Sequence, residues 1–312
     1  MSKQNQSSGV QMVRVDSDRA GQRLDNFLSA RLKGVPRSAI YRMIRTGQVR
    51  INGSRCKASS RLHEGDEVRI PPAQTRERGE HTVSDAVCRQ IESALIYEDE
   101  DVLVVDKPSG MAVHSGSGLP WGLIDVVRKL RTGEFIELVH RLDRETSGCL
   151  VLARSGAALN HLSALFREGG VDKRYLCLMN GVLREALTEV DVPLLKIQRG
   201  GQAEVEVSEL GKPALTRFKL LQSFSGSSYT EAELLTGRTH QIRVHAKHIG
   251  HPLAGDDRYA DKESVRNWRK QGLSRLFLHA HRLAFVSPSG EPFSIEAPLP
   301  EKLRAVLDQL EA

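Results

Sequence analysis

The stretch HRLDRETSG, residues 140–148, places one carboxylate, that of Asp143, between two arginines, Arg141 and Arg144. Nearby positive charge favours the ionised form of a carboxyl group, so we expect Asp143 to be charged near neutral pH. The Thr-Ser-Gly at the end of the stretch consists of turn-forming residues. The sequence therefore predicts that Asp143 lies on a loop rather than within a regular element.

Apolar runs lie on both sides of this loop. EFIELVH before it and CLVLA after it are typical of strands, which would place a charged, exposed turn between two buried strands. Loops of this kind often carry binding and catalytic residues. A salt-bridged structural turn is the alternative, and the motif taken alone favours it. The rest of the chain has to decide between the two.

The composition is that of a soluble globular protein. The chain has 312 residues, of which 39% are hydrophobic and 27% charged, enough for two domains with real cores. Residues 1–13 are polar and lack the apolar centre of a signal peptide, and no apolar run is long enough to cross a membrane. We expect a disordered tail over residues 1–13 and a cytoplasmic protein without membrane contacts.

Cofactor and metal motifs are not found in the sequence. No two cysteines have the CxxC spacing of a zinc site, and a disulfide framework is not indicated. Gly116 and Gly118 fit neither the P-loop nor the GxGxxG pattern. His240 and His245 are five residues apart, about 140° around a helix, unlike the i,i+4 histidines of zinc proteases. We therefore predict neither a metal nor a small-molecule cofactor.

Positive charge is concentrated near the N-terminus. Residues 14–70 contain 13 Lys/Arg and 6 Asp/Glu, whereas the rest of the chain contains 32 and 33. Solvated surface charge explains a modest excess, but it does not explain why the excess is confined to one segment. A small basic module joined to a near-neutral body indicates a docking domain for a polyanion.

The same segment has a clear pattern of elements. Residues 21–32 and 35–47 have helical spacing, and in the second helix Arg42 and Arg45 lie opposite an apolar face formed by Ile40, Met43 and Ile44. Asn52-Gly53 is a strong two-residue hairpin signal. From about residue 19 to 70 the chain resembles an S4 domain, through Arg-Leu-Asp at 23–25, the helix at 37–45, residues 49–53 and Gly-Asp at 65–66.

An S4 domain binds structured RNA, largely through shape and phosphate contacts. The resemblance implies a small α/β RNA-binding domain over residues 14–72, with RNA contacts from Arg23, Arg37, Arg42 and Arg45. The following PPAQTRERGEHTVSD combines two prolines with an aperiodic polar run. We expect a linker over residues 73–92 and a second domain over residues 93–312.

The second domain has another dense stretch, LLTGRTHQIRVHAKHIGHP, at residues 234–252. A strand is expected to end at the turn Thr236-Gly237-Arg238, and a helix to follow from about Thr239. Arg238 at this turn could reach the carboxylate of Asp143 on the other loop. Tyr175, near the start of the strand KRYLCLMNGVL, is read as a core residue from its position alone.

Four motifs together carry a resemblance to the RluA family of pseudouridine synthases, which covers the chain from about residue 95 onward. They are HRLDRETSG, LLTGRTHQIRVH, VDKPSGMAVH at 105–114 and KRYL at 173–176. The resemblance implies an α+β protein whose catalytic domain has a mixed, largely antiparallel sheet flanked by helices, with the target cleft crossing its middle.

The resemblance also assigns roles to residues. Asp143 would be the catalytic aspartate, Arg238 its ion-pair partner, Tyr175 the tyrosine beside the target base, and Arg141 a side chain that enters the duplex where the base leaves. Converting uridine to pseudouridine breaks the bond to N1 of the base and rejoins the base through C5. This needs neither redox change nor group donor, in agreement with the missing cofactor motifs.

With the S4 domain, the resemblance implies an enzyme acting on 23S ribosomal RNA in the large subunit or its precursor. The sequence has no exposed heptad or extended apolar stripe that demands an oligomer, so we expect a monomer. Three alternatives stay open at this point: an enzyme of the same family acting on other rRNA or tRNA sites, a non-catalytic rRNA-binding assembly protein, and a metal-dependent RNA hydrolase. The sequence does not decide which uridines are modified, or whether Asp143 attacks the sugar or the base or only assists elimination.

Overall fold

The structure, a computed structural model, describes residues 9–32, 35, 37–73, 83–115, 121–199 and 202–311. The first part of the predicted tail, much of the predicted linker, and Gly116 and Gly118 lie outside these ranges. The chain forms two compact units, and the main boundary between them falls between Val83 and Ser84. Each unit is described by itself.

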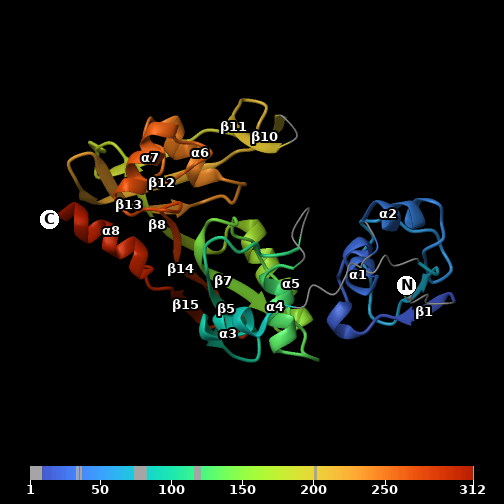
Figure 1. The fold of residues 1–312 in the computed structure, drawn as a ribbon. Helices are drawn as coiled ribbons and strands as arrows, with labels where there is room; N and C mark the ends of the chain where they lie inside the picture. Colours follow the sequence, from blue (N-terminus) through green and yellow to red (C-terminus); the bar gives the residue numbers. More distant parts are fainter. Residues whose placement is uncertain are drawn as a thin grey trace, which may run out of the picture. The chain divides into compact units, whose positions relative to one another are not determined.

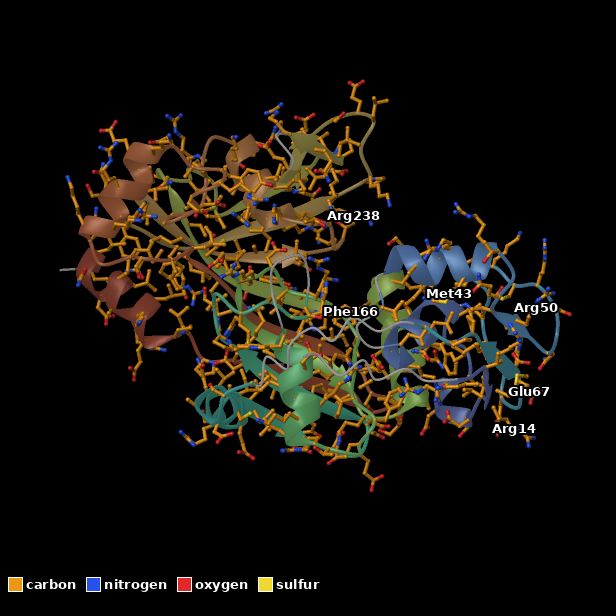
Figure 2. All side chains as sticks on the ribbon, turned by 45° about the vertical axis from the view of Figure 1, so that its right-hand side comes forward. Arg14, Met43, Arg50, Glu67, Phe166 and Arg238 are labelled. Atoms are coloured by element: carbon orange, nitrogen blue, oxygen red, sulfur yellow. The ribbon has the colours of Figure 1, made fainter. Side chains whose placement is uncertain are left out.

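The N-terminal unit combines two helices with a small antiparallel sheet of strand order β1-β3-β2. Its core is formed by eleven buried apolar residues: Val15, Leu24, Phe27, Leu28, Ile40, Met43, Ile44, Val49, Leu62, Val68 and Ile70. Figure 2 labels Met43 in this core and Arg14, Arg50 and Glu67 on its strands. The elements are β1 (Gln11–Arg14), a 3-10 turn (Ser17–Arg19), α1 (Leu24–Arg31), α2 (Arg37–Arg45), β2 (Arg50–Ile51) and β3 (Glu67–Ile70).

Both predicted helices and the hairpin turn are present in this unit. In α2, Ile40, Met43 and Ile44 are buried whereas Arg42 and Arg45 are exposed, as their spacing predicts. The turn after β2 uses Asn52 and Gly53 with φ of 49° and 75°, a left-handed pair that asparagine and glycine tolerate best.

The predicted ends of the tail and of the linker need correction. Strand β1 begins at Gln11 and pairs with β3, so residues 11–13 are part of the sheet rather than of a tail. Residues 85–92, predicted as linker, lie in helix α3 (Asp85–Ser93). Ser84 caps this helix by accepting a hydrogen bond from the Val87 N–H at 3.4 Å, and Cys88 and Ile91 are buried. Both stretches are ordered by contacts with residues that are distant in the sequence.

In the described part of the second unit, a ten-stranded sheet runs in the order β4-β5-β7-β14-β8-β13-β12-β9, with β15 added on β14 and β6 on β7. Only β7 and β14 are parallel neighbours, so the sheet is mixed and largely antiparallel, as predicted. The strands are β4 (Leu95–Glu98), β5 (Val102–Lys107), β6 (Glu137–Leu138), β7 (Ser147–Ala153), β8 (Asp172–Asn180), β9 (Leu187–Asp191), β12 (Leu215–Ser223), β13 (Ser227–Leu234), β14 (Leu278–Val286) and β15 (Pro292–Glu296).

Helices cover this sheet in two groups (Figure 1). Helix α5 packs on β5, β7 and β14 through Leu162, and α7 and α8 pack near β8 through Trp268 and Leu303. A separate hairpin is formed by β10 (Leu194–Arg199) and β11 (Gln202–Val207). The helices are α3, α4 (Leu123–Leu130), α5 (Gly156–Glu168), α6 (Gln241–His248), α7 (Lys262–Lys270) and α8 (Glu301–Glu311).

The opening motif is less of a loop than its composition predicts. Ser147 and Gly148, expected in a turn, are the first residues of β7 and pair with His279 and Ala280 of β14. Gly148 has φ of 110°, and a Cβ placed there would lie 2.2 Å from the carbonyl oxygen of Ala280. Glycine is therefore required by the close approach of β14. Asp143 lies in the loop just ahead of this junction, near the middle of the sheet.

Candidate active site

A cavity of about 270 Å³ opens beside Asp143, and every residue that the sequence singled out for catalysis lines it. This volume is close to the lower end of ordinary ligand pockets, roughly 300–1,000 Å³, and suits one flat ring. Arg238 and Phe166, labelled in Figure 2, both line it. The lining residues are His140, Arg141, Leu142, Asp143, Thr146, Phe166, Lys173, Tyr175, Leu234, Gly237, Arg238, Thr239, His240, Gln241, Ile242, Arg243 and Leu278.

The loop that carries Asp143 is held from behind by the DKPSG segment. The fully buried Lys107 donates its ammonium protons to the carbonyl oxygens of Pro108, Met111 and Arg144 at 2.9, 2.8 and 3.1 Å. Burial lowers the pKa of Lys107 to about 7, while three carbonyl acceptors favour its charged form. Ser109 adds a 2.7 Å hydrogen bond from its Oγ to the carbonyl oxygen of Glu145.

The two arginines beside Asp143 have different surroundings. Arg144 donates from Nε to the carbonyl oxygen of Gly110 at 2.8 Å and lies 3.6 Å from Glu145, so it supports the loop. Arg141 is exposed at the pocket. The side chain of Asp143 itself is 20% exposed, which leaves the carboxylate accessible to a bound group.

The partner of Asp143 differs from the predicted one. Nε2 of His240 lies 3.8 Å from Oδ2 of Asp143, whereas the exposed Arg238 donates from Nε to the carbonyl oxygen of Pro213 at 3.0 Å. Among the described residues, Arg238 makes no ion pair with Asp143, and the prediction is corrected in this respect. The turn is closed by Gln241, whose Oε1 accepts from the backbone N–H of Arg238 at 3.0 Å. Helix α6 then begins at Gln241 and leaves His240 facing the carboxylate.

His240 was considered in the sequence only as a metal ligand, and its contact with Asp143 was missed. Its Nδ1 lies 2.7 Å from the hydroxyl of Tyr259, a residue that no sequence motif singled out. Burial lowers the pKa of His240 to about 4, although the charge of Asp143 opposes this shift. The backbone of His240 is left-handed, with φ of 54°. Such a conformation is uncommon outside glycine and offers no signal in a single sequence.

Three aromatic side chains, those of Tyr175, His140 and Phe166, form an uncharged part of the wall. Tyr175, 8% exposed on β8, has a raised pKa, first because of burial and second because of the charge of Asp143. The ring of His140 stacks on Phe166, with centroids 4.4 Å apart, and its Nε2 accepts a hydrogen bond from the Val151 N–H at 3.0 Å. Burial, aided by the charge of Lys173, lowers the pKa of His140 to about 3. These residues therefore offer neutral surfaces to a planar ligand.

Among the described residues that line the cavity, Asp143 is the single carboxylate. Glycoside hydrolases usually work with a pair of carboxyl groups, one acid and one base or nucleophile. One carboxylate between aromatic walls suits a different task, in which it acts as nucleophile or proton acceptor on a planar base.

The predicted RNA-binding arginines of the N-terminal unit do not share one environment. Arg42 and Arg45 are exposed on α2, and Arg37 begins the same helix. Arg23 donates from Nε and a terminal nitrogen to the two oxygens of Asp25, at 3.0 and 2.8 Å, and Tyr41 donates to the same carboxylate. Arg23 thus has a structural contact, and its role with RNA stays a prediction.

Comparison with known proteins identifies the family of the chain. The chain is 47% identical to ribosomal large subunit pseudouridine synthase C of Escherichia coli (strain K12), over 98% of each chain. A family model described as RNA pseudouridylate synthase matches residues 101–248, which include both Asp143 and Arg238. The chain belongs to this family. An S4 domain model matches residues 22–68 and confirms the resemblance of the N-terminal segment to an S4 domain.

Further relatives extend the comparison. Ribosomal large subunit pseudouridine synthase C of Vibrio vulnificus (strain CMCP6) is 46% identical over 96% of each chain. The solved structure of human RNA pseudouridylate synthase domain containing 4 is 27% identical, with a TM-score of 0.61, and covers 73% of this chain and 96% of its own. No helix in the described ranges has the length and apolar character needed to span a membrane.

Proposed function

We propose that this protein isomerises uridines to pseudouridines in the 23S RNA of the large ribosomal subunit or its precursor, with Asp143 as the catalytic carboxylate. The observation that carries the proposal is that Asp143 and the buried Tyr175 line one cavity of base size. The full-length similarity to enzymes named for the large subunit supports the substrate.

The pocket suits a base that has left its helix. Extruding a base costs a few kcal/mol, which an enzyme recovers by stacking and by filling the gap. Tyr175 and the stacked pair of His140 and Phe166 provide the surfaces. In this proposal Arg141, which is exposed at the cavity, enters the duplex where the base leaves.

The reaction conserves all atoms. The bond between N1 and the sugar breaks, the uracil turns, a bond from C5 to the sugar forms, and a proton leaves C5 while N1 gains one. An ionised Asp143 can act as nucleophile or as proton acceptor in these steps. Arg238, on the same cavity, supplies positive charge near the site. No small-molecule cofactor is needed for this balance.

We assign initial RNA docking to the N-terminal unit. Arg37, Arg42 and Arg45 belong to one helix, and the latter two are exposed, as phosphate contacts require. Arg23 is assigned the same role through the part of its side chain that stays exposed, 45%. In this proposal the protein acts as a monomer in the cytoplasm.

Mapping pseudouridines in rRNA and tRNA from cells with and without the gene tests the proposal. We expect several 23S positions to lose pseudouridine, and to regain it when the wild-type gene but not its Asp143→Asn variant is supplied. Loss confined to tRNA would refute the substrate. Restoration by the Asp143→Asn variant would refute the catalytic assignment while leaving the substrate intact.

A further inference from the structure

Three side chains form a line that begins at the carboxylate of Asp143. His240 Nε2 lies 3.8 Å from Asp143 Oδ2, and His240 Nδ1 lies 2.7 Å from the hydroxyl of Tyr259. The rings of His240 and Tyr259 meet edge to face at 75°. Tyr259 is 4% exposed and the side chain of His240 is 13% exposed, so the line runs from the cavity into the protein.

The chemistry of the three groups determines where the protons lie. An ionised carboxylate only accepts, so the nitrogen facing it, Nε2, has to carry a hydrogen. With a pKa lowered to about 4 by burial, His240 holds one ring proton near neutral pH, and Nδ1 is therefore an acceptor. Burial raises the pKa of Tyr259, so its hydroxyl stays protonated and donates a hydrogen bond to Nδ1 of His240.

Tyr259 is itself held in place by a buried ion pair. Arg243 donates to both oxygens of Asp256 at 2.7 Å, and its guanidinium lies over the Tyr259 ring, 5.0 Å from the centroid. Asp256 also accepts from the backbone N–H of Tyr259 at 3.1 Å. The hydroxyl that contacts His240 is thus attached to a rigid support.

The backbone of His240 is strained in the position that it occupies. Among the described residues, His240 and Asn52 are the two non-glycine residues with positive φ, and Asn52 belongs to a hairpin turn that favours it. His240 is the third residue of the turn from Arg238 to Gln241, at a position where glycine or asparagine is usual, and a strained backbone of this kind persists where its surroundings demand it. Here that conformation directs the ring between Asp143 and Tyr259.

We propose that His240 is a positioning residue whose Nε2–H, oriented by the Tyr259 hydroxyl, holds the carboxylate of Asp143 for the reaction. The inference rests on the proposed function and deepens it. The 3.8 Å separation is longer than a hydrogen bond, and catalytic contacts of this kind tighten when the substrate is bound. Tyr259 acts one step further back, through the ring of His240.

Two amide substitutions at position 240 separate this role from a structural one. In His240→Gln the amide nitrogen reaches the place of Nε2 and can still donate to Asp143. In His240→Asn the shorter side chain reaches only the place of Nδ1. Asparagine, however, tolerates a left-handed backbone better than glutamine does. If the role of His240 is only structural, the asparagine variant should therefore be the more active of the two. If His240 positions Asp143, the glutamine variant should be the more active.

The measurement is kcat and KM on a 23S rRNA fragment, together with thermal unfolding of each full-length variant. We expect kcat of His240→Asn to fall about 100-fold, the loss typical of a displaced catalytic group, with KM within about twofold of wild type. His240→Gln should lose about tenfold or less, and Tyr259→Phe should fall between the two. The control is His248→Gln, which replaces an exposed histidine at the end of α6, the helix that follows His240, and should leave activity unchanged.

The proposal is overturned if the asparagine variant is as active as the glutamine variant or more so, or if Tyr259→Phe keeps the wild-type kcat. Should both position-240 variants fail to fold, Tyr259→Phe decides alone, because it removes a single oxygen atom. Failure of the proposed function has another signature: the wild-type enzyme then leaves 23S RNA unmodified, or Asp143→Asn retains activity.

Discussion

Helix α2 of the N-terminal unit and the cavity around Asp143 use charge in opposite ways. On α2, Arg42 and Arg45 extend into solvent from a helix whose other face is buried. Behind the Asp143 loop and in the cavity wall, Lys107 and Arg243 are enclosed, and each contacts defined protein atoms. Charges in solvent make weak contacts that are screened by salt and add up independently. Enclosed charges instead depend on the exact positions of the groups that they contact. The two regions should therefore respond very differently to substitution.

The largest effect is expected at Asp143. Replacing it with asparagine keeps the shape of the side chain but removes the negative charge, and product formation should fall by about 10⁴-fold or more, as for other essential catalytic groups. RNA affinity should change by less than about twofold, since the docking arginines are untouched. Single-turnover assays and a filter-binding titration on the same RNA measure both quantities. If the Asp143→Asn variant still forms product, Asp143 is not the catalytic carboxylate, and the contrast between the cavity and α2 fails.

The buried ion pair behind Tyr259 should be the next most sensitive. Asp256→Asn leaves the guanidinium of Arg243 buried without its partner, which should lower the free energy of unfolding by about 3–5 kcal/mol. Glu189→Gln is the matched control, because Glu189 pairs with Arg217 at the same 2.7 Å but both side chains are well exposed. That variant should lose about 1 kcal/mol or less. Urea unfolding compares them, and similar losses would contradict the distinction between enclosed and exposed charge.

Acid should destabilise the second unit, which carries Asp143, before the N-terminal unit. Burial lowers the pKa of His140 to about 3 and those of His240 and His279 to about 4. These folded-state pKa values lie below the unfolded value near 6.5. The stability that the three neutral histidines contribute is therefore fully present above pH 6.5 and is lost as the pH falls toward 4. The fully buried His279 should contribute about 1 kcal/mol per pH unit in this window.

The N-terminal unit should respond at lower pH. The pKa of Asp25 is lowered mainly by its hydrogen bond from Arg23, and its contribution is lost only as the pH falls below about 3.8. Both tryptophans, Trp121 and Trp268, belong to the second unit, so their fluorescence reports that unit alone. Fluorescence should change near pH 5 before circular dichroism shows complete unfolding. Coincident acid transitions would argue against separate responses.

The smallest effect is expected on α2. The double substitution Arg42→Ala with Arg45→Ala should weaken RNA binding several-fold and reduce the slope of log affinity against log salt by about 2, with kcat unchanged. Arg266→Ala with Arg269→Ala removes two exposed arginines at the same spacing from α7 and serves as the control. Equal losses in the two double variants would show that total charge, rather than the α2 surface, governs binding.

The site was predictable to the extent that it depends on motifs. Asp143, Tyr175, Arg238 and Arg141 were all identified from their sequence contexts, and the cavity brings them together. His240 was present in the same motif but was read differently, because its role depends on Tyr259, nineteen residues further along the chain. Arg238 was assigned to Asp143, whereas its guanidinium contacts the carbonyl oxygen of Pro213.

By itself, the sequence determined what arises from local periodicity and composition: the buried and exposed faces of α2, the Asn52-Gly53 turn, the two-part organisation, and the loops that carry the candidate site residues. Tertiary structure alone decided that Ser147 and Gly148 start a strand, because their partner β14 lies about 130 residues away. It also decided that Asp143 faces a histidine supported by a tyrosine. Helix faces depend on neighbours three or four residues apart, whereas these features depend on atoms brought together only when the sheet has formed.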